Sequence, residues 1–270
     1  MEPTCILITG IPHAGTRLLV QILNEHPDVS VPLDILDYVM EHSQIIYYYT
    51  RIMDATPIYS SEYVFDEDEM RFFMDMYKQS VDLSKPYYVF KAPIYPMMWL
   101  DWLVDYFEGK VKLVYTTRSP ERIFQSFVNK GQDELIFWRK NDNAMMSRFI
   151  KYLPPDRRMY YLATYDKRAY FYEMIEYYDS ACANWNSKHP ELPFTVFDIE
   201  KVTASRDSLS QFVQDLGLDE ARLDTMFELV DHERLYHRTK AKQSKITFKN
   251  VMRLITPPAL WSLGRNLVKR

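Results

Sequence analysis

The chain has 270 residues and 47% of them are hydrophobic, which is enough apolar material for one large α/β core. Its formal net charge of −4 excludes a non-specific nucleic-acid binder, because such proteins bind phosphates through an excess of Lys and Arg. No apolar run is as long as a transmembrane segment, and no basic leader opens the chain. We therefore expect a cytoplasmic protein whose two cysteines, Cys5 and Cys182, are reduced.

Short apolar runs alternate with helical patterns along the chain. The runs that predict β-strands are Thr4–Thr9, Tyr87–Lys91, Lys112–Thr117 and Phe194–Ile199. The patterns that predict helices are Thr16–Glu25, Asp34–Thr50, Asp66–Gln79, Met97–Phe107, Pro120–Lys130, Glu134–Tyr152, Lys167–Lys188, Ser205–Leu216 and Asp219–Leu229. This alternation indicates an α/β protein with a central, mostly parallel sheet flanked by helices. We expect a single domain over residues 1–270, with a helical, Tyr-rich insertion at about 131–188.

The first predicted strand ends in a glycine-bounded loop that opens a helix. Gly10 and Gly15 have the spacing of a phosphate-binding P-loop, G-x-x-x-x-G-K-[ST]. Thr16 and Arg17, however, occupy the positions where that motif has Lys and then Ser or Thr. A cation in the first turn of a helix is unfavourable beside the positive end of the helix dipole unless an anion binds there. Arg17, with His13 as a second donor, therefore predicts an anion-binding loop rather than an ordinary turn.

A second strand–turn–helix unit spans Lys112–Phe127. Arg118 lies at the carboxyl end of the strand, Pro120 is near the first position of the helix, and Ser126 follows two turns into it. Alone, an Arg after a strand and a Ser inside a helix are ordinary. The unit becomes informative only in combination with the first loop.

Together the two units resemble the sulfotransferase family whose donor is 3′-phosphoadenosine 5′-phosphosulfate (PAPS). The family's first loop, strand–G-x-P-[RK]-[ST]-G-T-[TS]–helix, corresponds to the run Gly10-Ile11-Pro12-His13-Ala14-Gly15-Thr16-Arg17. Its H-P-x-[VI] turn corresponds to His26-Pro27-Asp28-Val29, its K-x-P element to Lys91-Ala92-Pro93, and its R-x-P-x5-S signature to Arg118, Pro120 and Ser126. A late Y-E-D-L … F-L-G-L pattern is echoed by Phe197–Glu200 and by Phe212 with Leu216–Leu218. The resemblance runs in order from residue 6 to about residue 218.

The resemblance implies a P-loop-like sulfotransferase fold and transfer of a sulfuryl group from PAPS to a hydroxyl or amine. The first loop then wraps the 5′-phosphosulfate, through Gly10, Pro12, His13, Ala14, Gly15, Thr16 and Arg17. Arg118 and Ser126 hold the 3′-phosphate, and Lys91 stabilises the sulfuryl group in transfer. Such enzymes need no metal, which fits the missing magnesium-holding hydroxyl in the loop.

Two residues depart from the family pattern. His13 replaces an Arg or Lys, and an unperturbed imidazole is fully cationic only below a pKa of about 6.5. Arg17 replaces a Thr or Ser, and one hypothesis is that it supplies the fixed charge that His13 does not guarantee. The alternative is a decayed loop in a non-catalytic, nucleotide-binding relative. A P-loop kinase using ATP is disfavoured, because Gly15 is not followed by Lys and then Ser or Thr, and no Asp ends a clear apolar strand as a metal ligand.

A general base must remove the proton of the acceptor. Asp34 follows His26 by eight residues, where some family members have an acid, and Asp37 and His13 are its competitors. Asp34 also lies shortly after Pro32, at the start of a predicted helix, where an Asp is a common N-cap. We therefore expect Asp34 to be either the base or a cap.

The acceptor and the basic C-terminal segment each allow two interpretations. Tyr-rich stretches at Ile45–Thr50 and Met159–Tyr178 fit a groove for a small-molecule, carbohydrate or lipid acceptor, although tyrosines at helical spacing also pack in cores. The segment His237–Lys249 fits either a loop that closes over the nucleotide or a solvated face. The remaining His, Asp and Glu residues lack the spacing of metal ligands.

Overall fold

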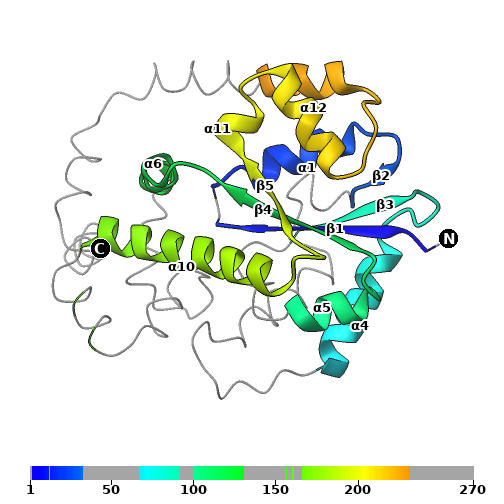
Figure 1. Ribbon diagram of the computed structural model, residues 1–270, viewed down its shortest axis with the longest axis horizontal. Coiled ribbons are helices and arrows are strands. Elements are labelled where there is room, and N and C mark those ends of the chain that lie inside the picture. Colours follow the sequence, from blue (N-terminus) through cyan, green and yellow to red (C-terminus); the bar gives the residue numbers. More distant parts are fainter. Residues whose placement is uncertain are drawn as a thin grey trace, which may run out of the picture.

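The computed structural model describes residues 2–11, 13–32, 67–91, 100–130, 156, 160 and 166–231. Within this part of the chain, five parallel strands form one sheet in the order β2-β3-β1-β4-β5 (Figure 1). They are β1 (Thr4–Gly10), β2 (Val29–Ser30), β3 (Tyr87–Lys91), β4 (Val111–Thr117) and β5 (Phe194–Asp198). The predicted strands are confirmed to within a residue at each end. β2 was not predicted, because two residues are too few to show a period.

The helices lie on both sides of this sheet. They are α1 (Thr16–Asn24), α4 (Glu67–Gln79), α5 (Leu100–Tyr106), α6 (Pro120–Lys130), α10 (Lys167–Lys188), α11 (Ile199–Val202), α12 (Arg206–Asp215) and a helix at 223–231. The predicted α/β class with a parallel sheet is confirmed. The helix predicted from Asp219 begins four residues later, because Asp219 accepts the Ala221 N–H in a turn that precedes it. The helices predicted at 34–50 and 134–152 lie outside the described residues.

β1 is covered on both faces, which explains its uninterrupted apolar sequence. Its residues from Cys5 to Gly10 are all buried. Successive side chains of a strand point to opposite faces, so Leu7 enters one core while Ile6 and Ile8 enter the other. A strand with one wet face would instead alternate apolar and polar residues. Cys5 and Cys182 are both buried free thiols.

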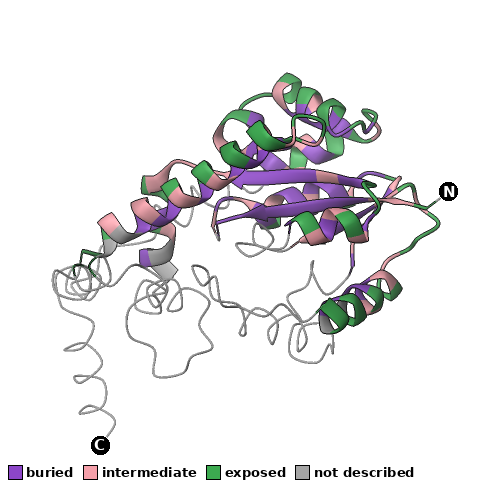
Figure 2. Ribbon diagram, turned by 60° about the horizontal axis from the view of Figure 1, so that its bottom comes forward, coloured by how far each residue is buried: buried purple, intermediate pink, exposed green. Residues whose placement is uncertain are grey.

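Two hydrophobic cores flank the sheet, and the strands appear as a buried layer in Figure 2. α4, α5 and α10 cover one face, to which Met74, Leu103 and Phe171 contribute. α1, α12 and the helix at 223–231 cover the other, with Leu19 and Phe212 among its members. None of the helices in the described ranges is long and apolar enough to span a membrane.

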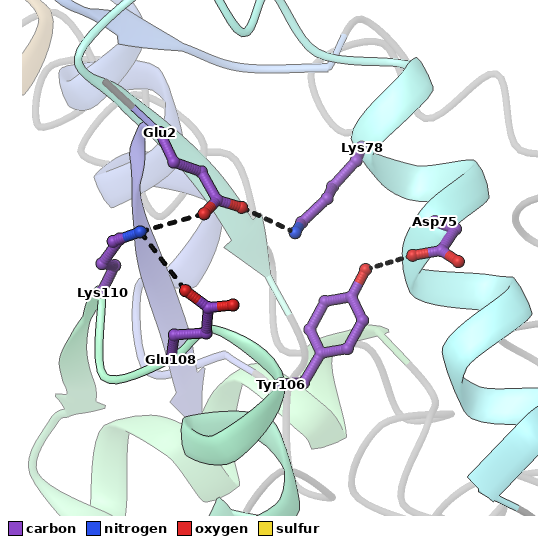
Figure 3. Close-up of polar contacts among 6 residues, drawn as sticks. All are labelled: Glu2, Asp75, Lys78, Tyr106, Glu108 and Lys110. Carbon is purple, nitrogen blue, oxygen red and sulfur yellow. Dashed lines mark hydrogen bonds and ion pairs between the residues drawn. The ribbon is translucent and has the colours of Figure 1, made fainter.

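Ion pairs and hydrogen bonds close the amino end of the sheet (Figure 3). The Glu2 carboxylate lies 3.4 Å from Lys78 Nζ of α4 and 3.0 Å from Lys110 Nζ, just before β4. The hydrogen bond from Lys110 and the charge of Lys78 hold the pKa of Glu2 below its usual value. Tyr106 OH donates to Asp75 Oδ1 at 2.5 Å and ties α5 to α4. These contacts lie at the opposite end of the strands from the two predicted motifs.

Candidate functional site

The order of the strands makes β1 the switch point of the sheet. From β1 the chain crosses to the edge strand β2, returns to β3 beside β1, and then passes to β4 on the other side of β1. Open parallel sheets bind ligands outside the carboxyl ends of the strands at such a switch point. Each predicted motif has a residue at this end of the sheet. Gly15 lies in the loop after β1, Lys91 is the last residue of β3, and Arg118 directly follows β4.

The loop after β1 depends on two glycines for its path. A Cβ on Gly10 would lie 2.2 Å from Thr116 Oγ1 of β4, and a Cβ on Gly15 would lie 2.8 Å from Ile199 Cδ1 of α11. Both glycines have a positive φ, 141° and 97°. His13 between them also has a positive φ of 75°, which is uncommon for a residue with a side chain. The loop is therefore pressed against β4 on one side and α11 on the other.

The N-terminus of α1 opens directly from this loop. Gly15 is its N-cap residue and provides no side chain, and the first turn contains no acidic residue. The backbone N–H groups of that turn accordingly lack a side-chain cap from Gly15, and they point toward the loop together with the positive end of the helix dipole. Arg17 lies in the same turn and is exposed. This combination suits an anion.

A hydrogen bond joins the two predicted motifs. Ser126 Oγ of α6 lies 3.1 Å from His13 Nδ1 of the first loop, although 113 residues separate them in the sequence. Ser126 is half-buried, one turn and a half along α6. The second unit therefore lies beside the first one.

Lys91 adds a cation from the neighbouring strand. It is the last residue of β3 and is half-buried. Burial lowers the pKa of Lys91 to about 8, and the charge of Arg17 acts in the same direction. The ammonium and the guanidinium thus come close from different elements, and an anion bound beside them would favour both charged forms.

Arg118 follows β4 and reaches a carboxylate on α11. Its Nε lies 3.7 Å from Glu200 Oε1, while Arg122 Nε lies 3.1 Å and Ser119 Oγ 3.2 Å from the same oxygen. Within the part of the chain that the structure describes, Arg118 Nε is buried and has no hydrogen-bond partner. Desolvation lowers the pKa of Arg118, and Glu200 only partly offsets that effect. The sequence analysis placed Glu200 in the late Phe197–Glu200 pattern but gave it no role in the site, because the pattern alone does not show which side chain it contacts.

A model of the sulfotransferase family matches residues 3–199, which is most of the chain. The chain belongs to the sulfotransferase family. A comparison with curated proteins found no match. Membership supports a sulfuryl-transfer function.

The matched region of this sulfotransferase contains the candidate site residues from Gly10 to Ser126 but not the basic segment 237–249. His13, Ala14, Gly15, Thr16 and Arg17 follow β1 in the loop and the first turn of α1. Pro12, and the base candidates Asp34 and Asp37, lie outside the described residues, as does the basic segment 237–249. Among the residues that the structure describes, no three His, Cys, Asp or Glu side chains form a group able to hold a metal ion.

One premise used against a kinase needs correction. β5 does end in an acidic residue, Asp198. Its Oδ1 accepts the N–H groups of Glu200 and Lys201 at 3.0 and 3.3 Å, and its Oδ2 pairs with Lys201 Nζ at 3.1 Å. In this sulfotransferase Asp198 is thus the N-cap of α11 and positions Glu200 and Ile199 beside the loop.

Proposed function

We propose that this sulfotransferase transfers the sulfuryl group of PAPS to a hydroxyl or amine of a small-molecule, carbohydrate or lipid acceptor. The proposal rests above all on the 3.1 Å hydrogen bond between His13 and Ser126, which joins the loop that we assign to the 5′-phosphosulfate to the helix that we assign to the 3′-phosphate. A molecule that carries anionic groups at both ends of one ribose needs two such motifs side by side. ATP has no 3′-phosphate and would leave the Arg118 end of the site without a ligand.

The 5′-phosphosulfate is assigned to the loop and to the two cations at its mouth. The N–H groups of residues 14–17 and the dipole of α1 favour negative charge there. Arg17 and Lys91 supply full positive charges from α1 and β3. Thr16 and Arg17 stand where a P-loop NTPase has a Lys that contacts the phosphates and a Ser or Thr that binds Mg²⁺, so the proposal includes no metal.

The 3′-phosphate is assigned to Arg118 and Ser126. Arg118 Nε is buried beside a carboxylate that lies too far away for a hydrogen bond. A phosphate oxygen at this position would give that donor a partner and offset the desolvation of the guanidinium. Ser126 would then exchange its bond to His13 for one to the phosphate, or hold both.

The transfer itself is an in-line displacement at sulfur. The acceptor oxygen or nitrogen forms the new bond to sulfur while the bond from sulfur to the 5′-phosphate oxygen breaks, and adenosine 3′,5′-bisphosphate leaves with the electron pair. Lys91 is assigned to the sulfuryl oxygens and the leaving oxygen, where charge accumulates. The proton of the acceptor goes to a base, for which Asp34 is the proposed residue and His13 the competitor.

Calorimetric titration with adenosine 3′,5′-bisphosphate and with ATP–Mg²⁺ tests the donor. We expect the bisphosphate to bind more tightly by about 100-fold, and Arg118→Ala, Arg17→Ala and Ser126→Ala each to weaken it by about tenfold or more. Arg206→Ala is the matched control, because Arg206 also begins a helix but pairs with Asp224 at 2.7 Å, far from the loop in sequence. Transfer of labelled sulfate from PAPS to a panel of acceptors then tests turnover. Preference for ATP–Mg²⁺ would favour a kinase, and binding without turnover a non-catalytic relative.

A further inference from the structure

Three side chains at the start of the second motif's helix approach one carboxylate oxygen of Glu200. Its Oε1 accepts from Ser119 Oγ at 3.2 Å and pairs with Arg122 Nε at 3.1 Å and Arg118 Nε at 3.7 Å. The side chain of Glu200 is about one-third exposed. The carboxylate therefore lies in the position of an anion for the same arginine that we assign to the 3′-phosphate.

The position of Glu200 is fixed by its own helix and by the loop. Asp198 caps α11 and accepts the N–H of Glu200 itself at 3.0 Å. Ile199, the preceding residue, lies against Gly15, where a Cβ would be only 2.8 Å away from Ile199 Cδ1. Glu200 thus borders both halves of the candidate site. The family match ends at Ile199, so Glu200 falls just outside it.

The distances show which arginine holds the carboxylate. Arg122 is mostly exposed and lies within hydrogen-bond distance of Glu200, whereas Arg118 is more buried and lies beyond it. A buried guanidinium beside an incomplete ion pair gains most from a better anion. A phosphate dianion near Glu200 would be attracted by Arg118 and repelled by the carboxylate.

We propose that Glu200 is an internal anion that competes with the 3′-phosphate for Arg118 and lowers the affinity for nucleotides that carry this phosphate. When the 3′-phosphate binds Arg118, the Glu200 carboxylate stays paired with Arg122. Arg118 can therefore change its anionic partner from Glu200 to the phosphate. Glu200 is a specificity-determining residue, since it acts on the 3′-phosphate through Arg118. The inference rests on the proposed function.

The test compares adenosine 3′,5′-bisphosphate with adenosine 5′-phosphate, which lacks the 3′-phosphate. We expect Glu200→Gln to lower the dissociation constant of the bisphosphate by roughly tenfold and to leave that of the 5′-phosphate unchanged. Glu121→Gln is the matched control, because Glu121 lies next to Arg122 in sequence but contacts Arg168 and Tyr172 of α10. Glu121→Gln also removes one negative charge, but from α6, and should leave the ratio of the dissociation constants of the bisphosphate and the 5′-phosphate unchanged.

A second variant shows whether Glu200 competes with the 3′-phosphate for Arg118 or instead holds Arg118 in place for it. Arg122→Ala removes the alternative partner of Glu200, so it should weaken the bisphosphate, and Glu200→Gln in the same chain should cancel that loss. If Glu200 instead holds Arg118 in place, Glu200→Gln will weaken the bisphosphate, and the inference is wrong. An unchanged ratio, or equal gains for both ligands, also overturns it. If the wild-type protein binds no bisphosphate at all, the proposed function itself is wrong, and the inference is lost with it.

Discussion

His13 shows how one residue can depart from its family pattern and still suit its place. The usual Arg or Lys has only donors, whereas an imidazole nitrogen can accept. His13 Nδ1 lies 3.1 Å from the Ser126 hydroxyl, so the histidine can accept from the serine of the second motif when neutral. A lysine at this position could only donate to it. The substitution therefore changes how the loop contacts α6, in addition to its charge.

Lys91 gives the site a pH dependence of definite sign. Burial and the charge of Arg17 lower the pKa of Lys91 to about 8, so the amine is charged below that pH and neutral above it. Phosphate groups have their second pKa at about 6 and are already doubly charged in this range. Binding of an anion raises the pKa of Lys91, and binding above about pH 8 must therefore take up a proton.

We expect the affinity for adenosine 3′,5′-bisphosphate to be nearly constant from about pH 7 to 8 and to fall above about pH 8, by at most about tenfold per pH unit. Calorimetry in buffers of different ionisation enthalpy measures both the affinity and the proton uptake. Lys91→Met should bind the bisphosphate weakly, and its affinity should not fall above about pH 8. Lys91→Arg stays charged in this range, so it should bind the bisphosphate and its affinity should not fall there either. A fall that persists in Lys91→Met would assign the titration to another group.

At the scale of elements, the approach of β1 to β4 fixes where the loop begins. Gly10 pairs with Thr116, and Thr116 Oγ1 donates to the Thr9 carbonyl oxygen at 3.1 Å. A Cβ on Gly10 would lie 2.2 Å from that hydroxyl and 2.4 Å from the Thr116 carbonyl oxygen. Because a backbone atom is involved, a side-chain rotation does not relieve the clash.

Gly10→Ala should therefore lower the free energy of unfolding by about 3 kcal/mol or more, from overpacking and from the positive φ together. Gly109→Ala is the control, because Gly109 also has a positive φ, 72°, but nothing lies within 4 Å of the added Cβ. We expect about 1 kcal/mol there. Urea denaturation of both variants measures the difference, and equal losses would show that the contact with β4 contributes nothing.

At the scale of the whole molecule, His26 joins segments that are 193 residues apart. It is buried after α1; its Nδ1 accepts the Asp28 N–H at 3.2 Å, and its Nε2 donates to Asp219 Oδ1 at 3.0 Å. This places the H-P turn between the layer of α1 and the segment after α12. Hydrogen bonds from Ala221 N and then His26 lower the pKa of the exposed Asp219 carboxyl.

His26→Ala should lower the free energy of unfolding at about pH 7 by about 2 kcal/mol, since it opens a cavity and removes both bonds. Because the pKa of Asp219 is lowered on folding, its contribution is complete above the usual Asp pKa and is lost as the pH falls through the folded value. Asp219→Asn should thus be less stable than the wild type at about pH 7, and the difference should shrink as the pH falls through the lowered pKa of Asp219. His189→Ala, at a half-exposed histidine stacked on Trp185, is the control, with a smaller expected loss.

Much of the fold could be predicted because its signals are local. The uninterrupted apolar run of β1 reports burial on both faces, and Pro120 marks the start of α6. The two-residue β2 and the turn before the helix at 223–231 depend on contacts with distant residues, so no local pattern revealed them. In the same way, Arg118 and Ser126 were assigned to the site from motif spacing, whereas Glu200 was matched to a pattern without its contact with Arg118.

The parallel α/β architecture, the family resemblance and the loop that lacks Lys and a magnesium-holding hydroxyl can all be read from the sequence, because each is encoded over a short stretch of residues. The fold sets the contact of His13 with Ser126, the approach of Lys91 to Arg17 with the lowered Lys91 pKa of about 8, and the convergence of Ser119, Arg118 and Arg122 on one oxygen of Glu200. The physical reason is that these interactions require a distance and a degree of burial, and both are set by how β3, β4 and β5 align beside β1.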